Sequence, residues 1–372
     1  MYLHWPFCQA KCPYCDFNSH VAKFVDQAAW AAAFCQQIEY FGELTRERLL
    51  TSIFFGGGTP SLMDASVVET ILNKARATWR WVNDIEITLE ANPTSVEADR
   101  FRDYRLAGVN RISMGLQALR DQDLKALGRL HTVAEAKSAF KTAQSIFDRV
   151  SFDLIYARQD QSLSDWRSEL AEALSFSADH LSLYQLTIED GTAFADRFRA
   201  GGLKGLPDQD VAAEMYEVTQ EMCDAAGLPA YEISNHAKPG AESRHNLTYW
   251  KGGNWIGIGP GAHGRLSLNT TVYGIEATSN PNMWLSQATR NPEEPTVWHN
   301  IPEAEQATER LLMGMRLTEG ISLENWLLPY LNHQKVETFQ EMRLIEVEHG
   351  SIKTTARGRL LLDSILKDII AD

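Results

Sequence analysis

The first half of the chain alternates between short apolar runs and longer segments with helical periodicity. Six runs have the β-branched, apolar character of strands, at Tyr2–His4, Ser52–Phe55, Ile85–Leu89, Arg111–Met114, Val150–Ile155 and Leu181–Leu186. Amphipathic patterns between them predict helices at Ala28–Leu50, Asp64–Trp79, Val96–Ala107, Ala134–Phe147 and Leu163–Leu174. Six β–α repeats predict a parallel sheet with right-handed crossovers. Because a closed barrel has eight units, we expect an α/β fold with a partial (β/α)6 TIM-like barrel over residues 1–190.

The pattern changes after about residue 190. Pro207–Ala226 predicts a helix, Tyr231–Leu268 is rich in glycine and aromatic residues with little periodicity, and Asn280–Pro302 has the prolines of a linker. We therefore expect an extension with a linker at residues 191–300. A C-terminal, mostly helical, winged-helix-like domain is expected at residues 301–372. Its predicted elements are helices at Glu303–Arg316, Leu323–Leu331 and about 356–370, and a hairpin at Ile345–Lys353 that turns at His349–Gly350.

Composition narrows the class of protein. The 372 residues are 44% hydrophobic and 23% charged, with a formal net charge of −14, which argues against non-specific binding to nucleic acid or to an anionic membrane. No apolar run approaches the ~20 residues of a membrane span. The N-terminus lacks the charged and apolar regions of a signal peptide. We expect a cytoplasmic protein that is not an integral membrane protein and does not bind nucleic acid.

Three of the five cysteines are clustered as Cys8-x3-Cys12-x2-Cys15 directly after the first strand. Three thiolates on one short loop are suited to three corners of a cubane iron–sulfur cluster, which leaves the fourth iron open for a ligand. A zinc site with His4 or His20 as fourth ligand is the alternative. Structural zinc sites usually have two ligand pairs, however, and the sequence has no second pair. The other two cysteines, Cys35 and Cys223, lie in helical patterns and are expected to be buried thiols.

Polar and glycine-rich positions follow several of the predicted strands. Gly56, Gly57, Gly58 and Thr59 follow the second strand, where glycine permits a close approach of the backbone to a ligand. Glu90 ends the third strand, and Gln117, Arg129 and Asp153 follow at or after the next strand ends. Each alone would predict an ordinary turn or surface hydrogen bond. Together they favour a cofactor site, because barrel chemistry is located at the C-terminal strand ends.

The cysteine spacing after a first strand resembles the signature of radical S-adenosylmethionine (SAM) enzymes. The flanking segments Tyr2–Cys8 and Cys15–Ser19 resemble the oxygen-independent coproporphyrinogen III oxidases and their relatives. The resemblance implies a [4Fe–4S] cluster held by Cys8, Cys12 and Cys15, with SAM on the open iron and one-electron cleavage of SAM to a 5′-deoxyadenosyl radical. It also implies SAM contacts from Tyr2, Tyr14, Gly57, Gly58, Thr59, Glu90, Gln117, Arg129 and Asp153.

Two features differ from the oxidases and resemble the HemW-type haem chaperones. Phe17 stands where the oxidases carry a further cysteine, and the oxidases' long N-terminal arm is absent. The segment His245-Asn-Leu-Thr-Tyr249-Trp250 resembles an H-N-x-x-Y-W motif associated with haem binding. The resemblance implies that His245 is an axial ligand of haem iron. His236 and His263 are weaker candidates, and without the resemblance a lone histidine beside aromatic residues predicts a packed side chain.

Three functions remain open at this stage. The resemblance favours a haem chaperone that binds haem as cargo and hands it to haem-accepting respiratory proteins. It further implies an electron donor such as flavodoxin or ferredoxin, and a cluster and SAM that support homodimerisation or transfer. The alternative is oxidative decarboxylation of coproporphyrinogen III to protoporphyrinogen IX in porphyrin biosynthesis, an activity that we predict to be absent. The third is an unrelated radical SAM reaction on the same barrel.

Overall fold

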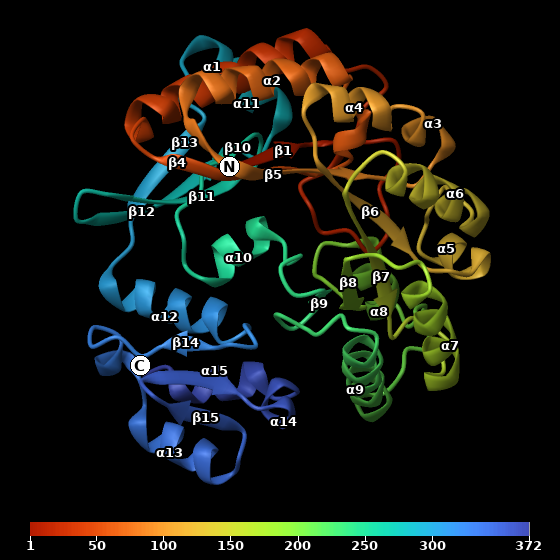
Figure 1. The fold of residues 1–372 in the computed structure, drawn as a ribbon, viewed down its shortest axis with the longest axis vertical. Helices are drawn as coiled ribbons and strands as arrows, with labels where there is room; N and C mark the ends of the chain where they lie inside the picture. The colour runs from red at the N-terminus through yellow and green to blue at the C-terminus, as the bar shows by residue number, and fades with distance from the viewer. Residues whose placement is uncertain (372) are drawn as a thin grey trace.

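The computed structural model describes residues 1–371, except for the side chains of residues 95 and 96. Its main sheet has eight strands, and all neighbouring pairs are parallel except β8 and β9 (Figure 1). In spatial order they are β10 (Gly257–Ile258), β1 (Tyr2–Trp5), β4 (Leu49–Gly57), β5 (Arg80–Ala91), β6 (Arg111–Gln117), β7 (Arg149–Tyr156), β8 (His180–Gln185) and β9 (Asn235–Ala237). All six predicted strands are confirmed, and the fold is the expected partial barrel.

Helices cover the outer face of this sheet, as amphipathic patterns between parallel strands require. They are α1 (Gln27–Thr45), α2 (Ala65–Thr78), α3 (Ser95–Ala98), α4 (Phe101–Ala107), α5 (Asp121–Ala126), α6 (Val133–Gln144), α7 (Leu163–Leu174) and α9 (Gln209–Ala225). Capping boxes begin α6 at Thr132 and α7 at Ser162, while Gly108 ends α4 with φ 115°. The single helix predicted over Val96–Ala107 is wrong, since the chain there forms the two short helices α3 and α4.

The predicted linker at Asn280–Pro302 is also wrong. It contains α11 (Pro281–Arg290) and β13 (Thr296–Asn300), and Trp284 of α11 is fully buried and stacks on Trp30 of α1 with ring centroids 5.4 Å apart. β13 completes an antiparallel sheet with β11 (His263–Leu268) and β12 (Thr271–Ala277). Four further short elements are the strands β2 (Phe7–Cys8) and β3 (His20–Val21), which form a parallel pair, and the helices α8 (Ala193–Arg199) and α10 (Arg244–Trp250).

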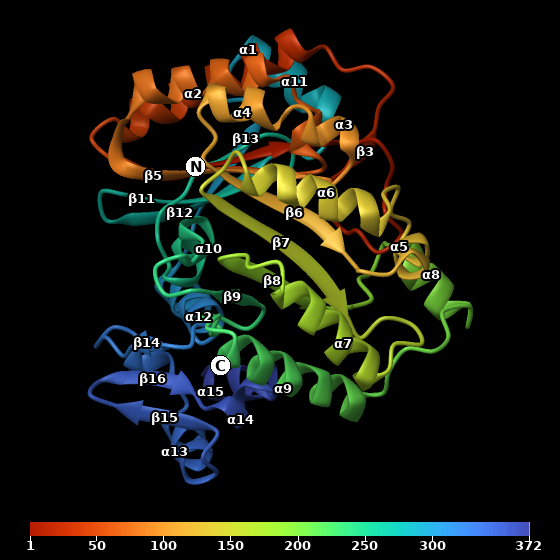
Figure 2. The same cartoon turned by 45° about the vertical axis from the view of Figure 1, so that its right-hand side comes forward.

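The C-terminal region has its own hydrophobic core and lies below the barrel in Figure 2. Its elements are α12 (Glu303–Gly314), β14 (Ile321–Ser322), the 3-10 turn Leu328–Tyr330, α13 (His333–Glu341), β15 (Ile345–Glu348), β16 (Ser351–Thr354), α14 (Ala356–Arg359) and α15 (Leu362–Ile369). The predicted hairpin is confirmed, with His349 and Gly350 both at positive φ in its turn. The helix predicted at Leu323–Leu331 is wrong, because only its last turn is helical and α13 begins after it. Among residues 1–371, no helix combines the length and the apolar character that a membrane crossing requires.

Candidate functional site

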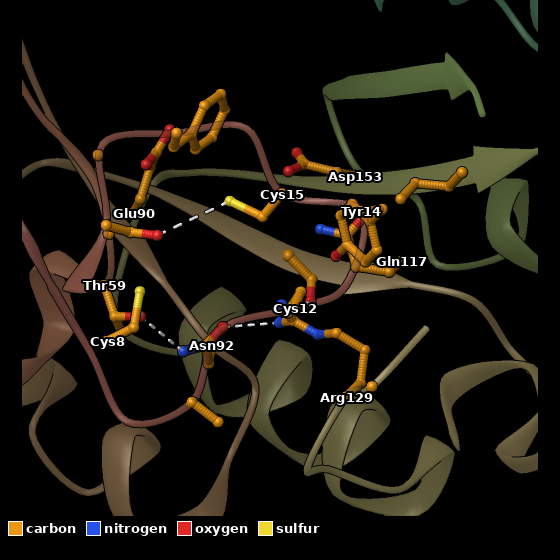
Figure 3. A pocket seen from close by; sticks show the side chains of 18 of the residues that line it. Cys8, Cys12, Tyr14, Cys15, Thr59, Glu90, Asn92, Gln117, Arg129 and Asp153 are labelled. Carbon is orange, nitrogen blue, oxygen red and sulfur yellow. Dashed lines mark hydrogen bonds between the residues drawn. The ribbon is translucent and has the colours of Figure 1, made fainter. Parts of the chain in front are cut away.

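A cavity of about 350 Å³ lies at the C-terminal ends of the barrel strands. Residues in or after β2, β4, β5, β6, β7 and β8 all contribute to its wall, which is the arrangement that a parallel barrel produces. Figure 3 shows its polar side chains around the three clustered cysteines. Most of the site residues expected from the sequence line it: Cys8, Cys12, Tyr14, Cys15, Gly57, Gly58, Thr59, Glu90, Gln117, Arg129 and Asp153.

The three clustered thiols are each next to a polar group. Thr59 Oγ1 donates to Cys8 Sγ at 3.4 Å, Arg129 donates to Cys12 Sγ at 3.5 Å, and Cys15 Sγ lies 4.0 Å from Ser19 Oγ. Burial raises the pKa of the Cys8 and Cys15 thiols, against hydrogen bonds with neighbouring groups such as the Ser19 hydroxyl, which lower it. A hydroxyl and a guanidinium beside buried thiols stabilise thiolates, which are the form that ligates iron. The residues therefore fit a cluster held by three cysteines.

The histidines of the zinc alternative are already engaged by protein groups. His4 Nδ1 is 2.9 Å from the Tyr2 hydroxyl, and His4 Nε2 is 2.9 Å from the Asn18 carbonyl oxygen. His20 Nε2 is bound to Asn18 Oδ1 at 3.0 Å. Both nitrogens of His4 are thus already hydrogen-bonded within the protein. The geometry disfavours a zinc site that includes His4.

The glycine-rich turn after β4 is required by close packing against the first strands. Gly57 has φ +107°, and a Cβ there would lie 2.7 Å from the His4 ring. A Cβ on Gly58 would lie 2.7 Å from the Phe7 carbonyl oxygen. A side chain at either position would push the turn away from β1 and β2. The glycines thus hold the turn next to the cysteine loop and also form part of the cavity wall.

Two carboxyl groups from different strands face the cavity. Burial and the nearby Asp153 raise the pKa of Glu90 to about 8. Burial raises the pKa of Asp153 to about 7, against the opposing effects of Arg129, Arg111 and Gln117. The pKa of each carboxyl therefore lies near neutral pH. Both carboxyls are available to accept hydrogen bonds from hydroxyl or ammonium groups of a ligand.

Arg129 is held by a network that the sequence did not reveal. It donates to Asn92 Oδ1 at 2.6 Å and to the Gly115 carbonyl at 2.9 Å, while the Asn92 amide donates to Thr59 Oγ1 at 3.3 Å. Asn92 thus connects the glycine-rich turn to the arginine (Figure 3). Its position two residues beyond Glu90, at the same strand end, was the sequence signal that could have identified Asn92 as a site residue. Tyr184 and Gln185, at the end of β8, were missed in the same way and also line the cavity.

Gln117 occupies a strained position at the end of β6. Its φ is 70°, and the pairing of β6 with β7 shifts register between Met114 and Gln117. Left-handed backbone is costly for a residue with a side chain and is concentrated at functional sites. This bulge brings the Gln117 amide beside Asp153, where it favours the ionised carboxylate.

Two of the expected site residues lie outside the cavity wall. Tyr2 and His245 stack together near the start of β1, at the other end of the barrel, with ring centroids 5.7 Å apart. His245 is 8% exposed and is enclosed between Phe54, at 4.1 Å, and the edge of Tyr249, at 4.6 Å. Burial, the nearby chain N-terminus and Arg111 lower the pKa of His245 well below its ordinary value. The expected haem motif is therefore a packed helix, α10, rather than an open, flexible segment.

Comparisons with known proteins agree with this geometry. The family model of the radical SAM superfamily matches residues 2–171, and the family model of the HemN C-terminal domain matches residues 301–361. Among solved structures, coproporphyrinogen III oxidase (HemN) from Escherichia coli, a radical SAM enzyme, superposes with a TM-score of 0.81. This match covers 98% of the present chain and 88% of the other at 19% sequence identity, and it shows a shared fold.

Several curated proteins are similar over much of their length. The mitochondrial radical S-adenosyl methionine domain-containing protein 1 of Bos taurus is 36% identical, with 100% of this chain and 87% of that protein covered. The protein named heme chaperone HemW of Haemophilus influenzae is 35% identical, with 99% and 96% covered. HemW of Escherichia coli is 44% identical, with 72% and 70% covered.

Proposed function

This chain belongs to the family of radical SAM proteins that includes HemW and mitochondrial radical S-adenosyl methionine domain-containing protein 1, and we propose that it is a cytoplasmic haem chaperone. In this function it binds haem as cargo and delivers it to haem-requiring respiratory proteins. The observation that carries the proposal is similarity to heme chaperones over nearly the whole chain, barrel and C-terminal region together. Similarity to the oxidase HemN, in contrast, rests on the fold at a much lower identity.

Membership of the family implies a [4Fe–4S] cluster and SAM. We assign the cluster to Cys8, Cys12 and Cys15. When bound together, cluster and SAM supply one-electron chemistry, the reductive cleavage of SAM. The cavity residues would bind and orient SAM: Glu90 and Asp153 as acceptors for its hydroxyl and ammonium groups, Arg129 as a cation, Gln117 and Tyr14 as polar walls, and Gly57, Gly58 and Thr59 as the backbone floor. Tyr2, which lies beneath the cavity, would act through its contact with His4.

The haem ligand proposed from the sequence is His245. Its side chain is enclosed, so it can bind haem iron only after its neighbours move. Its imidazole is covered by Phe54 and Tyr249 while α10 is in place. We therefore propose that His245 coordinates haem iron only in a state in which α10 has moved away from β4. Gly240 and Gly252, both at positive φ, flank this seven-residue helix and are suited to such a movement. Tyr249 and Trp250 would then be free to cover the macrocycle.

Partners follow from the same proposal. We propose a flavodoxin- or ferredoxin-type electron donor, because a [4Fe–4S] cluster must be reduced before it can cleave SAM. Homodimerisation supported by the cluster and SAM is the accompanying proposal.

The test separates cargo handling from porphyrin oxidation. Anaerobically reconstituted protein is incubated with SAM, a reductant and either coproporphyrinogen III or haem. We expect stoichiometric haem binding, transfer to a haem-free acceptor and no protoporphyrinogen IX. Robust, SAM-dependent formation of protoporphyrinogen IX would contradict the chaperone function and support the oxidase alternative.

A further inference from the structure

A chain of hydrogen bonds connects Asn92 to two of the three clustered thiols. The side-chain amide of Asn92 donates to Thr59 Oγ1 at 3.3 Å, and Thr59 Oγ1 donates to Cys8 Sγ at 3.4 Å. On the other side, Arg129 donates to Asn92 Oδ1 at 2.6 Å and to Cys12 Sγ at 3.5 Å. Figure 3 shows the amide between the hydroxyl and the guanidinium. One side chain therefore holds a hydrogen-bond donor beside each of two sulfur atoms.

The direction of each hydrogen bond in this chain follows from the chemistry of the groups. The guanidinium of Arg129 can only donate, so Asn92 must turn its oxygen toward Arg129 and its NH2 group toward Thr59. Thr59 Oγ1 accepts that N–H, which leaves its own hydrogen for Cys8 Sγ. A carboxylate at position 92 would accept on both sides and would draw the Thr59 hydrogen away from the sulfur. The amide is thus needed as an acceptor on one side and as a donor on the other.

The backbone of Asn92 is held independently of its side chain. Its N–H donates to Glu97 Oε2 at 2.8 Å, and Glu97 is 4% exposed and also accepts the Ser61 hydroxyl. Pro93, the next residue, restricts Asn92 to extended backbone conformations. A change confined to the side-chain amide should therefore alter the two sulfur donors while the strand end stays in place.

Hydrogen bonds to ligand sulfurs are among the factors that set the reduction potential of an iron–sulfur cluster. Reduction adds one negative charge, which a hydroxyl or guanidinium donor beside the sulfur stabilises, so such donors raise the potential. We propose that Asn92 is a positioning residue that raises the reduction potential of the cluster through the hydrogen-bond donors on its two sides. The step concerned is the transfer of one electron from the proposed flavodoxin- or ferredoxin-type donor to the cluster, in which no bond forms or breaks. The inference rests on the proposed assignment of the cluster to the three cysteines.

The test measures the midpoint potential of the cluster in the anaerobically reconstituted full chain without SAM, by redox titration followed by electron paramagnetic resonance. Asn92→Asp adds a negative charge and turns the Thr59 hydrogen away from Cys8. We expect the ratio of reduced to oxidised cluster at a given potential to fall by at least about tenfold, which is a shift of about 59 mV for one electron. The matched control is Asn73→Asp, which adds the same charge at an exposed position of α2 and should keep the wild-type potential.

A pair of neutral variants separates the effect of the hydroxyl from that of the added charge. Thr59→Val removes the donor to Cys8 at nearly constant size and should also lower the potential, whereas Thr59→Ser keeps a hydroxyl and should return the potential toward the wild-type value. If Asn92→Asp assembled no cluster, Thr59→Val would decide, because Asn92 and Arg129 are unchanged in it. If Thr59→Val kept the wild-type potential, or if Asn92→Asp behaved like its control, the inference would be wrong although the proposed cluster would stand. A wild type that bound no iron and sulfide would instead contradict the cluster assignment itself.

Discussion

The carboxyl of Glu90 makes a quantitative prediction about the protein without its cofactors. Folding raises its pKa from the ordinary value of 4.5 to about 8, mainly through burial and secondly through Asp153. A difference of about 3.5 pH units at about 1.4 kcal/mol per unit corresponds to about 5 kcal/mol between the two protonation states. Since the side chain keeps partial contact with solvent in the cavity, we expect somewhat less than half of this, about 2 kcal/mol.

The sign follows from the direction of this change. A carboxyl with a raised pKa in the folded protein contributes its full stability below pH 4.5, where both states are protonated, and this stability is lost as the pH rises through about 8. The substitution Glu90→Gln removes the titration and keeps a polar group of similar size. The variant should therefore gain about 2 kcal/mol relative to the wild type between pH 5 and pH 9.

The assay is urea unfolding of the cofactor-free protein at pH 5, 7 and 9. Glu69→Gln is the matched control, because Glu69 is exposed on α2 and far from the cavity in the fold. As a function of pH, the free energy of unfolding of the control should follow a curve parallel to that of the wild type. If Glu90→Gln were also parallel to the wild type from pH 5 to pH 9, Glu90 would not be a buried, protonated carboxyl and the electrostatic description of the cavity would be wrong.

Three further substitutions test the cluster, the packing of the second half and the C-terminal core. Cys12→Ala should abolish the cluster, measured as loss of the about four iron atoms and matching sulfide per chain, while the far-UV circular dichroism stays that of the wild type, since the loop is peripheral to the barrel core. Trp284→Ala should lower the free energy of unfolding by about 3–5 kcal/mol, because Trp284 is fully buried against Trp30; a loss near zero would indicate a loose linker. Gly358→Ala should destabilise the C-terminal region by about 1–3 kcal/mol in thermal unfolding, because the added Cβ would lie 1.8 Å from the Leu344 carbonyl oxygen.

The barrel strands could be predicted because burial determines their composition. Strands covered on both faces become continuous apolar runs, and the helices between them keep one polar face. The pattern fails where an element depends on a distant partner. β10 is only two residues long and is defined by its pairing with β1, as in Tyr2↔Gly257. Likewise, α11 lies in a proline- and asparagine-rich segment, and its place is fixed by the contact of Trp284 with Trp30.

The cavity at the strand ends was predictable for a related reason. In a parallel barrel the strand ends converge, so polar residues at several strand ends must meet, and Glu90, Gln117 and Asp153 do so. Asn92 was missed because its role depends on the side chains of Thr59 and Arg129, which lie far away in the sequence. The location of His245 could not be inferred from its motif either. An aromatic-rich segment is compatible with a haem surface or with a packed helix, and only the neighbours Phe54 and Tyr2 decide between them.

The location of His245, the proposed haem ligand, bears on the difference between a chaperone and an oxidase. A decarboxylating enzyme must bring a porphyrin propionate into the cavity at which we propose that SAM binds, because a deoxyadenosyl radical abstracts hydrogen only from an atom in contact with it. His245 is enclosed at the other end of the barrel, so iron held by this residue would be separated from that cavity by the protein. For a cargo this separation is favourable, since haem held by His245 would be kept away from the radical.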